Sequence, residues 1–140
     1  MTSSTTAART IGIHHAGLTV PDLEAAAGFF EQALGFTRVG GQPDYPSLFL
    51  TDGTVLITLW QAKDPAHAVP FDRHHHLGLH HLALRVADAS ALERLHGDLA
   101  GRADTVVEFA PQPLGGGPTR HMMCAIPGGI RLELIAPAAR

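Results

Sequence analysis

The stretch Leu77-Gly-Leu-His-His-Leu-Ala-Leu-Arg-Val-Ala-Asp88 decides the fold, because the chain carries a second copy of its pattern. Near the N-terminus stands Ile13-His-His-Ala-Gly-Leu-Thr-Val-Pro-Asp22, and a shift of 66 positions aligns the two stretches without a gap. The alignment places the pair His14-His15 on His80-His81, and it places Asp22 on Asp88. A duplicated unit of His pair, strand and Asp indicates a repeated supersecondary module.

A second pair of matching segments lies later in each copy. Asp52-Gly-Thr-Val-Leu-Ile-Thr-Leu59 aligns with Pro127-Gly-Gly-Ile-Arg-Leu-Glu-Leu134 at a shift of 75 positions. The larger shift fits an insertion in the Gly- and Pro-rich run 111–118, which is typical of a loop. Thr58 therefore occupies the position that Glu133 has in the other copy.

Composition indicates one globular domain. The chain has 140 residues, of which 45% are hydrophobic and 16% charged, and its formal net charge is −3. No basic run and no long apolar stretch occurs, so we expect neither a nucleic-acid partner nor a membrane span. Residues 1–10 are polar and lack the apolar core of a signal peptide, which predicts a flexible arm and a cytoplasmic protein. The single Cys124 excludes an internal disulfide and a Cys-type zinc site.

Residues 11–62 are predicted to form a βαβββ module. A strand over 11–20 leads to Asp22, a good helix N-cap, and the helix runs to Leu34, where Gly35 ends it. Three strands follow, over residues 36–40, 47–51 and 54–61.

Residues 79–136 are predicted to form the second module of one domain that spans 11–136. The segment 63–78 has no clean period and is predicted to be a linker, in which the run of three His at 74–76 reads as a solvated loop. Asp88 or Ser90 caps the second helix. The predicted strands of this module begin at residue 79 and continue over 105–109, 120–126 and 130–135.

Strand periodicity predicts which side chains share a face. Leu132 and Leu134 should pack under a helix, which places Glu133 on the opposite face. The same parity places His15, Thr58 and His81 on the faces away from the helices. We therefore expect an α+β fold whose two βαβββ modules have sheets curled around a shared cup.

Two imidazoles and one carboxylate in such a cup predict a divalent-metal site made by His15, His81 and Glu133. A 2-His-1-carboxylate set leaves coordination positions open for water and substrate. It suits Fe²⁺, and Zn²⁺, Mn²⁺, Co²⁺ and Ni²⁺ also fit such donors. His14 and His80 have the opposite parity, although a one-residue bulge would exchange each with its neighbour.

Parity also nominates residues for the rest of the site. His121 is predicted to act as acid or base, since an imidazole titrates near neutral pH. Trp60 could form an apolar wall beside Thr58, and Arg85 and Arg131 could meet a substrate carboxylate or lie in solvent. The predicted substrate-binding residues are Thr58, Trp60, Arg85, Met123 and Arg131.

The segments 15–24 and 29–36 resemble the vicinal oxygen chelate superfamily. This group includes glyoxalase I, extradiol dioxygenases, methylmalonyl-CoA epimerase, and fosfomycin and bleomycin resistance proteins. The segments 81–88 and 127–133 match its second-module signatures, and the resemblance covers roughly residues 11–136. It implies paired βαβββ modules around one metal, frequently within a dimer, and a substrate bound through two adjacent oxygens with the metal as Lewis acid. Carried over residue by residue, the implied ligands are His15, His81 and Glu133.

Two positions depart from the activities of that superfamily. Thr58 stands where glyoxalase I has a ligand that also takes part in proton transfer, and Thr is no general base near neutral pH. Met123 stands where extradiol enzymes usually carry a Tyr, ten residues before the Glu ligand.

We therefore expect a metal-dependent homodimeric enzyme that acts on a small metabolite. The expected reaction is that of a glyoxalase-like lyase or isomerase, or of an extradiol-type dioxygenase. The alternative is a metal-free, antibiotic-sequestering resistance protein of the bleomycin-binding type.

Overall fold

The computed structural model describes residues 6–138 and contains two βαβββ modules, which confirms the predicted α+β class. The elements of the first module are β1 (His15–Val20), α1 (Leu23–Leu34), β2 (Thr37–Gln42), β3 (Ser47–Thr51) and β4 (Leu56–Gln61). Those of the second are β5 (Leu82–Arg85), α2 (Ala89–Ala100), β6 (Val106–Pro113), β7 (Arg120–Ala125) and β8 (Arg131–Ala136). A single 3-10 turn, η1 (Pro65–His67), lies in the linker between them. Residues 1–5 of the predicted arm lie outside the described residues.

The two sheets have the same topology. Their strand orders are β1-β4-β3-β2 and β5-β8-β7-β6. The pairs β1–β4 and β5–β8 run parallel, while all other neighbours run antiparallel. Gly17 pairs with Thr58 in the first sheet, and Ala83 pairs with Glu133 in the second. These four positions are related by the sequence repeat, so the repeat extends to the strand register.

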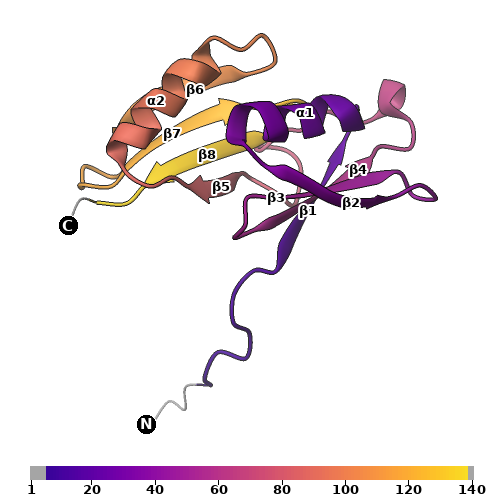
Figure 1. Ribbon diagram of the computed structural model, residues 1–140, viewed down its shortest axis with the longest axis horizontal. Coiled ribbons are helices and arrows are strands. Elements are labelled where there is room, and N and C mark those ends of the chain that lie inside the picture. The colour runs from indigo at the N-terminus through magenta and orange to yellow at the C-terminus, as the bar shows by residue number, and fades with distance from the viewer. Residues whose placement is uncertain (1–5, 139–140) are drawn as a thin grey trace.

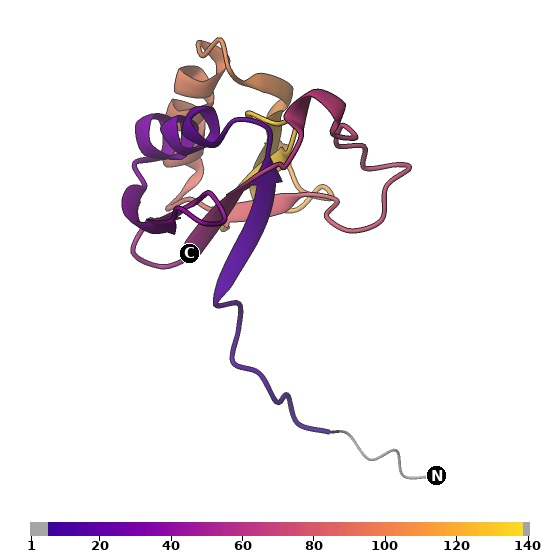
Figure 2. The same cartoon turned by 90° about the vertical axis from the view of Figure 1, so that its right-hand side faces the viewer.

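Both helices cover the same side of the molecule, and the two sheets lie side by side beneath them (Figure 1). The sheets do not close around a cup within the chain, which differs from the expected arrangement. No backbone ladder joins them, since the described strands form two separate four-stranded sheets. The described N-terminal residues run away from the body as an extended arm (Figure 2). None of the helices in residues 6–138 is long and apolar enough to span a membrane.

Asp residues begin both helices, as predicted. Asp22 and Asp88 each have extended backbone angles and accept a hydrogen bond from the amide three residues on, at 3.0 and 2.8 Å. Asp88 rather than Ser90 is thus the second cap, because the Ser90 hydroxyl accepts from Arg94 instead. Gly35 ends α1 in the left-handed region at φ 73°, where glycine carries no steric cost.

One hydrophobic core joins the two modules. It packs the buried faces of α1 and α2 against the helix-facing side chains of both sheets. At the junction, the Arg102 guanidinium lies 5.8 Å from the centroid of the Phe29 ring and 3.5 Å from the Gln32 side chain. The largest fully buried side chains are Phe29, Phe30, Leu50, Ile57, Leu59, Leu92, Leu99, Met122, Leu132 and Leu134.

Three predicted strand bounds were wrong by three residues or more. The first strand of the second module, predicted to begin at residue 79, is β5 and begins at Leu82. The first strand begins at His15 and not at residue 11, because its partner strand β4 begins at Leu56, which pairs with His15. β6 extends to Pro113, although Pro111 and Pro113 predicted a loop. β6 is an edge strand of its sheet, where a proline without an N–H can be accommodated on the open side.

Candidate metal centre

Glu133 occupies the centre of the second sheet. Its neighbours Leu132 and Leu134 are fully buried against the helix side, so alternation turns Glu133 to the opposite face. Ala83 and Met123 flank it on the paired strands. The residue is only 9% exposed. Among residues 6–138, none donates a hydrogen bond to its carboxylate.

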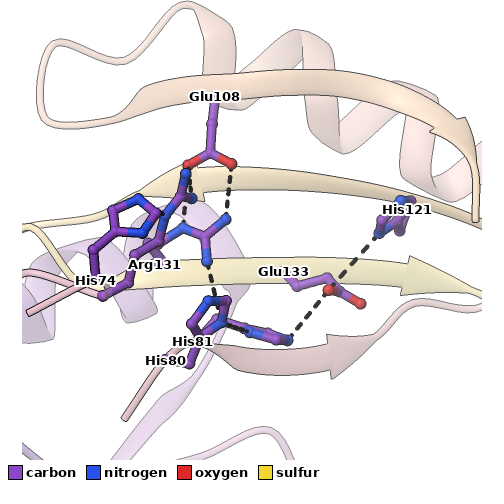
Figure 3. A network of polar contacts seen from close by, with 8 residues as sticks. His74, His80, His81, Glu108, His121, Arg131 and Glu133 are labelled. Atoms are coloured by element: carbon purple, nitrogen blue, oxygen red, sulfur yellow. Dashed lines mark hydrogen bonds and ion pairs between the residues drawn. The ribbon is translucent and has the colours of Figure 1, made fainter. Parts of the chain in front are cut away.

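Two imidazoles converge on this carboxylate (Figure 3). His81, directly before β5, places Nε2 3.4 Å from Glu133 Oε2. His121, on the neighbouring strand β7, places Nδ1 3.7 Å from the same oxygen. The structure therefore brings together three residues that the sequence analysis nominated.

His121 has an unpaired nitrogen in a confined position. Its side chain is 12% exposed, and its Nδ1 is buried without a hydrogen-bond partner in the described part of the chain. The Phe109 ring packs against the imidazole at a centroid distance of 4.9 Å. This nitrogen is therefore available to hold or accept a proton, or to bind a ligand.

His15 lies apart from this cluster. It is exposed, and its Nδ1 lies 2.9 Å from Nδ1 of His14. His80 and His81 make the same contact at 2.8 Å, with ring centroids 5.1 Å apart against 5.2 Å in the first pair. Within residues 6–138, no group of three or more His, Cys, Asp or Glu side chains could hold a metal by itself. One described chain thus offers His81 and Glu133 without the third predicted ligand.

Thr58 faces an indole rather than an acidic group. It is 5% exposed, and its Oγ1 accepts a hydrogen bond from Trp60 Nε1 at 2.9 Å. Gly17 on the neighbouring strand leaves room for this pair, since a Cβ there would lie only 3.1 Å from Thr58 Oγ1.

Two aromatic residues that the sequence analysis did not nominate adjoin Trp60. The Tyr45 ring meets Trp60 edge-on at 4.8 Å, and the Phe49 ring lies 5.9 Å away. Phe49 pairs with Thr58, so strand parity could have placed it on this face. Tyr45 lies in a turn, where periodicity gives no information.

The two nominated arginines differ in their partners. Arg131 is 11% exposed, and two hydrogen bonds of 3.1 and 2.8 Å bind it to both oxygens of Glu108. Arg73 of the linker adds a 2.8 Å ion pair to the same carboxylate. These cations, Arg131 first, hold the pKa of Glu108 below its usual value. Arg85 is exposed and makes no hydrogen bond or ion pair within the described residues.

The linker is exposed at its three consecutive histidines, as the solvated-loop interpretation predicted. Asp72 organises it, accepting hydrogen bonds from the His74 and His75 amides and lying 2.7 Å from His75 Nδ1. A cavity of about 640 Å³ lies between this linker, β1 and the turn that precedes β8. Its lining includes none of His81, His121 and Glu133, so the candidate metal centre lies on the sheet face and not in this cavity.

His80 connects the arginine cluster to the candidate metal centre. Its Nδ1 lies 3.4 Å from Arg131 Nη1, on the side of the guanidinium that Glu108 leaves free. Desolvation, followed by the charge of Arg131, lowers the pKa of His80.

A sequence model of the Glyoxalase/Bleomycin resistance protein/Dioxygenase superfamily matches residues 12–134. The chain belongs to this superfamily. Its members commonly bind divalent metals and small-molecule substrates and often form dimers. No curated protein sequence matches the chain.

Solved structures share the fold. A glyoxylase/bleomycin resistance protein/dioxygenase domain from Frankia sp. EAN1pec is 24% identical with a TM-score of 0.78, covering 91% of this chain and 98% of that one. A lactoylglutathione lyase from Agrobacterium tumefaciens is 20% identical with a TM-score of 0.69, covering 91% and 95%. A fosfomycin resistance protein from Listeria monocytogenes is 14% identical with a TM-score of 0.72, covering 92% and 95%. At these identities the likeness establishes the fold alone.

Proposed function

We propose that this protein is a divalent-metal enzyme that acts on a small metabolite bound through two adjacent oxygen atoms. The observation that carries the proposal is the Glu133 carboxylate, which is nearly buried, lacks a hydrogen bond from the described residues, and faces His81 Nε2 at 3.4 Å. Two imidazoles at 3.4 and 3.7 Å compensate this poorly solvated carboxylate only weakly, and a cation held between these groups would compensate it better. Two ligands about 2.1 Å from a tetrahedral ion stand about 3.4 Å apart, so the separation fits.

His81 and Glu133 would hold the ion, which when bound would supply Lewis acidity for negative charge that develops on a substrate oxygen. The third proposed ligand is His15 of a second copy of the chain. His15 turns Nδ1 to its neighbour in the same way as His81, so the Nε2 atom of each ring points away from its histidine neighbour. A homodimer is consistent with sheets that remain open within one chain.

His121 is the proposed acid or base. Thr58 cannot take a proton near neutral pH, whereas His121 Nδ1 can hold one and lies beside the proposed metal ligands. Both a glyoxalase-like lyase or isomerase and an extradiol-type dioxygenase need a proton acceptor beside the substrate. Arg85 is the proposed cation for a substrate carboxylate, because Arg131 is already paired with Glu108.

Metal content tests the proposal directly. Untagged protein would be purified without a nickel column, because ten histidines could load nickel. Elemental mass spectrometry would compare the wild type with His81→Ala and Glu133→Gln, and with Thr58→Val as the matched change at the equivalent position of the first module. We expect about one metal per chain, lost in the first two variants and retained in the third. Protein that takes up no Fe²⁺, Mn²⁺, Co²⁺, Ni²⁺ or Zn²⁺ after anaerobic reconstitution would refute the metal mechanism.

Mixing two defective chains tests whether the site is shared. His15→Ala and His81→Ala chains, unfolded together and refolded, would form mixed dimers in which one of two shared sites is intact. We expect about one quarter of the wild-type metal to return on mixing, and almost none in either variant alone. No recovery, with the dimer present by light scattering, would show that all ligands come from one chain.

A metal-free binding protein is the second candidate, and the aromatic cluster of Tyr45, Phe49 and Trp60 favours it. Such rings can bind an apolar or planar ligand by stacking. Trp60 is the only tryptophan, so its fluorescence reports on this face alone. Ligand-induced quenching that is equal in wild type and Glu133→Gln, together with no metal uptake, would favour this candidate over the enzyme.

A further inference from the structure

We infer that two copies of this chain bind each other through two short apolar segments, with residues 11–13 of each copy packed against residues 77–79 of the other. The inference rests on the proposed function, in which a second copy supplies His15, because it names the surface that would bring that copy into place. The contact itself involves no metal, so it can be tested in the metal-free protein.

Both segments expose aliphatic side chains to water. Ile11 and Leu77 are fully exposed, and Ile13 and Leu79 are 83% and 41% exposed. Neither segment belongs to a sheet, because β1 and β5 begin only after them. A single exposed aliphatic residue is ordinary, but a group of them on an unpaired stretch of chain commonly marks an interaction surface.

The two segments are equivalent in the sequence repeat. The shift of 66 positions places Ile-Gly-Ile at residues 11–13 on Leu-Gly-Leu at residues 77–79. Their backbones also match, since Gly12 and Gly78 both have a φ of 118°, a value that favours glycine. Each module therefore begins with two aliphatic side chains on either side of the same backbone bend.

The sequence around these segments carries no formal charge. No Asp, Glu, Lys or Arg occurs in residues 11–20 or in residues 74–84. Extended segments and strand edges that remain in water are usually protected by charged side chains or by proline. Here the two segments can pack together without removing an ion from water.

The surface beside residues 77–79 is hollowed and apolar. Leu77 and Leu79 line the cavity of about 640 Å³ beneath the linker, together with Val69, Phe71 and Ile130. Val69 is itself 76% exposed. An isoleucine side chain that arrives from outside therefore has an aliphatic recess to enter.

A second copy is the occupant that covers both segments at once. In a two-fold dimer, a contact of one segment with the other is repeated with the roles exchanged, so two contacts cover all four segments. Within one chain, the N-terminal arm runs away from the body and leaves both segments in water (Figure 2). The repeat makes the two surfaces alike, so each is apolar where the other is apolar.

The contact would also bring the proposed ligands together. Ile13 lies two residues before His15, and Leu79 lies two residues before His81. Two residues of extended chain span about 7 Å. Packing of Ile13 on Leu79 of the other copy would therefore hold His15 close to the His81 and Glu133 of that copy.

Sedimentation equilibrium of the metal-free protein, in the presence of a chelator, provides the first test. The wild type should be a dimer. The arm variant, Ile11→Ser with Ile13→Ser, and the linker variant, Leu77→Ser with Leu79→Ser, should each weaken the dimer by about 100-fold or more. Each variant removes two aliphatic side chains from both contacts of the dimer.

A matched control removes exposed aliphatic side chains from elsewhere. Val39→Ser with Val106→Ser changes two exposed valines outside the segments, and it should leave the dimer unchanged. All substituted side chains are exposed, so the variants should fold and unfold in urea at the wild-type midpoint. Dissociation without a shift in that midpoint would separate loss of the contact from loss of the fold.

Chemical cross-linking provides the second test. Ile13→Cys and Leu79→Cys chains would be mixed and treated with a short bismaleimide, while the native Cys124 is buried and should not react. We expect a covalent dimer in the mixture and single chains when either variant is treated alone. A covalent dimer from either variant alone would overturn the pairing of residues 11–13 with residues 77–79. So would an internal link, found by mass spectrometry, in a chain that carries both substitutions.

The outcomes separate this inference from the proposed function. A monomeric wild type, or a dimer that survives both the arm and the linker variants, would overturn the inference even if the protein binds metal. A dimer that both variants dissociate, in a protein that takes up no metal, would support the inference and reject the metal enzyme.

Discussion

The two modules share one backbone plan but present different chemistry on equivalent positions. The second sheet carries Glu133 and Arg131, and the first carries Thr58 and Leu56 in their places. The two His pairs make the same ring contact, with Nδ1 atoms 2.9 and 2.8 Å apart. Both copies of the repeat therefore contain the His pair, but the residues on the same sheet faces differ. They are ionic in the second module and aromatic in the first.

This comparison shows that a histidine's role depends on its neighbours across the sheet. In the second module, parallel pairing of β5 with β8 places Glu133 opposite Ala83, two residues after His81. In the first, the equivalent position is a threonine already bonded to Trp60. The position occupied by the Glu133 carboxylate beside His81 is thus occupied in the first module by a hydroxyl that is bonded to an indole.

The prediction with the largest expected effect tests whether the two modules unfold together. Leu59 and Leu134 are equivalent in the repeat, and both are almost fully buried in one continuous core. Leu59→Ala and Leu134→Ala should each lower the free energy of unfolding by about 3–5 kcal/mol, through lost burial and a cavity. Urea denaturation would measure this. One transition at the same midpoint by circular dichroism and Trp60 fluorescence is expected, and two separate transitions would show that the modules unfold independently.

Thr58→Glu makes the first module resemble the second. The introduced carboxylate would lie on a nearly buried position without a cation, and we expect a loss of about 2–4 kcal/mol in unfolding free energy at neutral pH. Thr58→Gln is the control, since it has similar volume without the charge. A loss that is equal in the two variants would mean that volume, and not buried charge, distinguishes the modules.

Thr58→Val tests the hydrogen bond between Thr58 and Trp60, which the first module has where the second has the Glu133 carboxylate. The Trp60 N–H would lose its acceptor at 2.9 Å, at a cost of about 1 kcal/mol because the indole is partly buried. Urea denaturation would measure this cost, and the fluorescence of the sole tryptophan would change with it. Thr51→Val, in the same sheet but away from the indole, should leave the emission spectrum unchanged. An unaltered spectrum in Thr58→Val would argue against the hydrogen bond.

The smallest expected effect concerns the ionic cluster of the second module. The hydrogen bond from Arg131 lowers the pKa of Glu108 below its usual 4.5, so the folded state is favoured when this carboxylate is charged. This contribution is present above pH 4.5 and is lost as the pH falls through the lowered pKa. Glu108→Gln should therefore be less stable than the wild type at pH 6, by at most about 1 kcal/mol because Glu108 is partly exposed, with the difference shrinking toward pH 3. A difference that grows on acidification would have the wrong sign.

Local signals made much of the fold predictable. Asp22 and Asp88 could be predicted as N-caps because an Asp directly before an apolar run of helical period commonly accepts hydrogen bonds from the first amides of the helix. Strand bounds were less predictable, since β1 begins only where Leu56 offers a partner. Pro113 lies within β6 because an open sheet edge accommodates a missing N–H, and edge position is a property of the assembled sheet.

The candidate site was predictable in part. Parity correctly placed Glu133 opposite its buried neighbours, and the repeat singled out His81 beside it. Neither signal could reveal Glu108 or its contact with Arg131, because the two residues are distant in sequence and meet only through strand packing.

The sequence by itself determined the two-module plan, the helix caps and the strand face on which Glu133 lies, because these follow from repeats and from the local periods of helix and strand. Tertiary structure alone decided which of the predicted ligands meet. It joined His81, His121 and Glu133 through the pairing of β5, β8 and β7, and it left His15 on a separate sheet. Periodicity specifies the face of a strand, whereas the packing of one sheet relative to another depends on contacts between residues far apart in the chain.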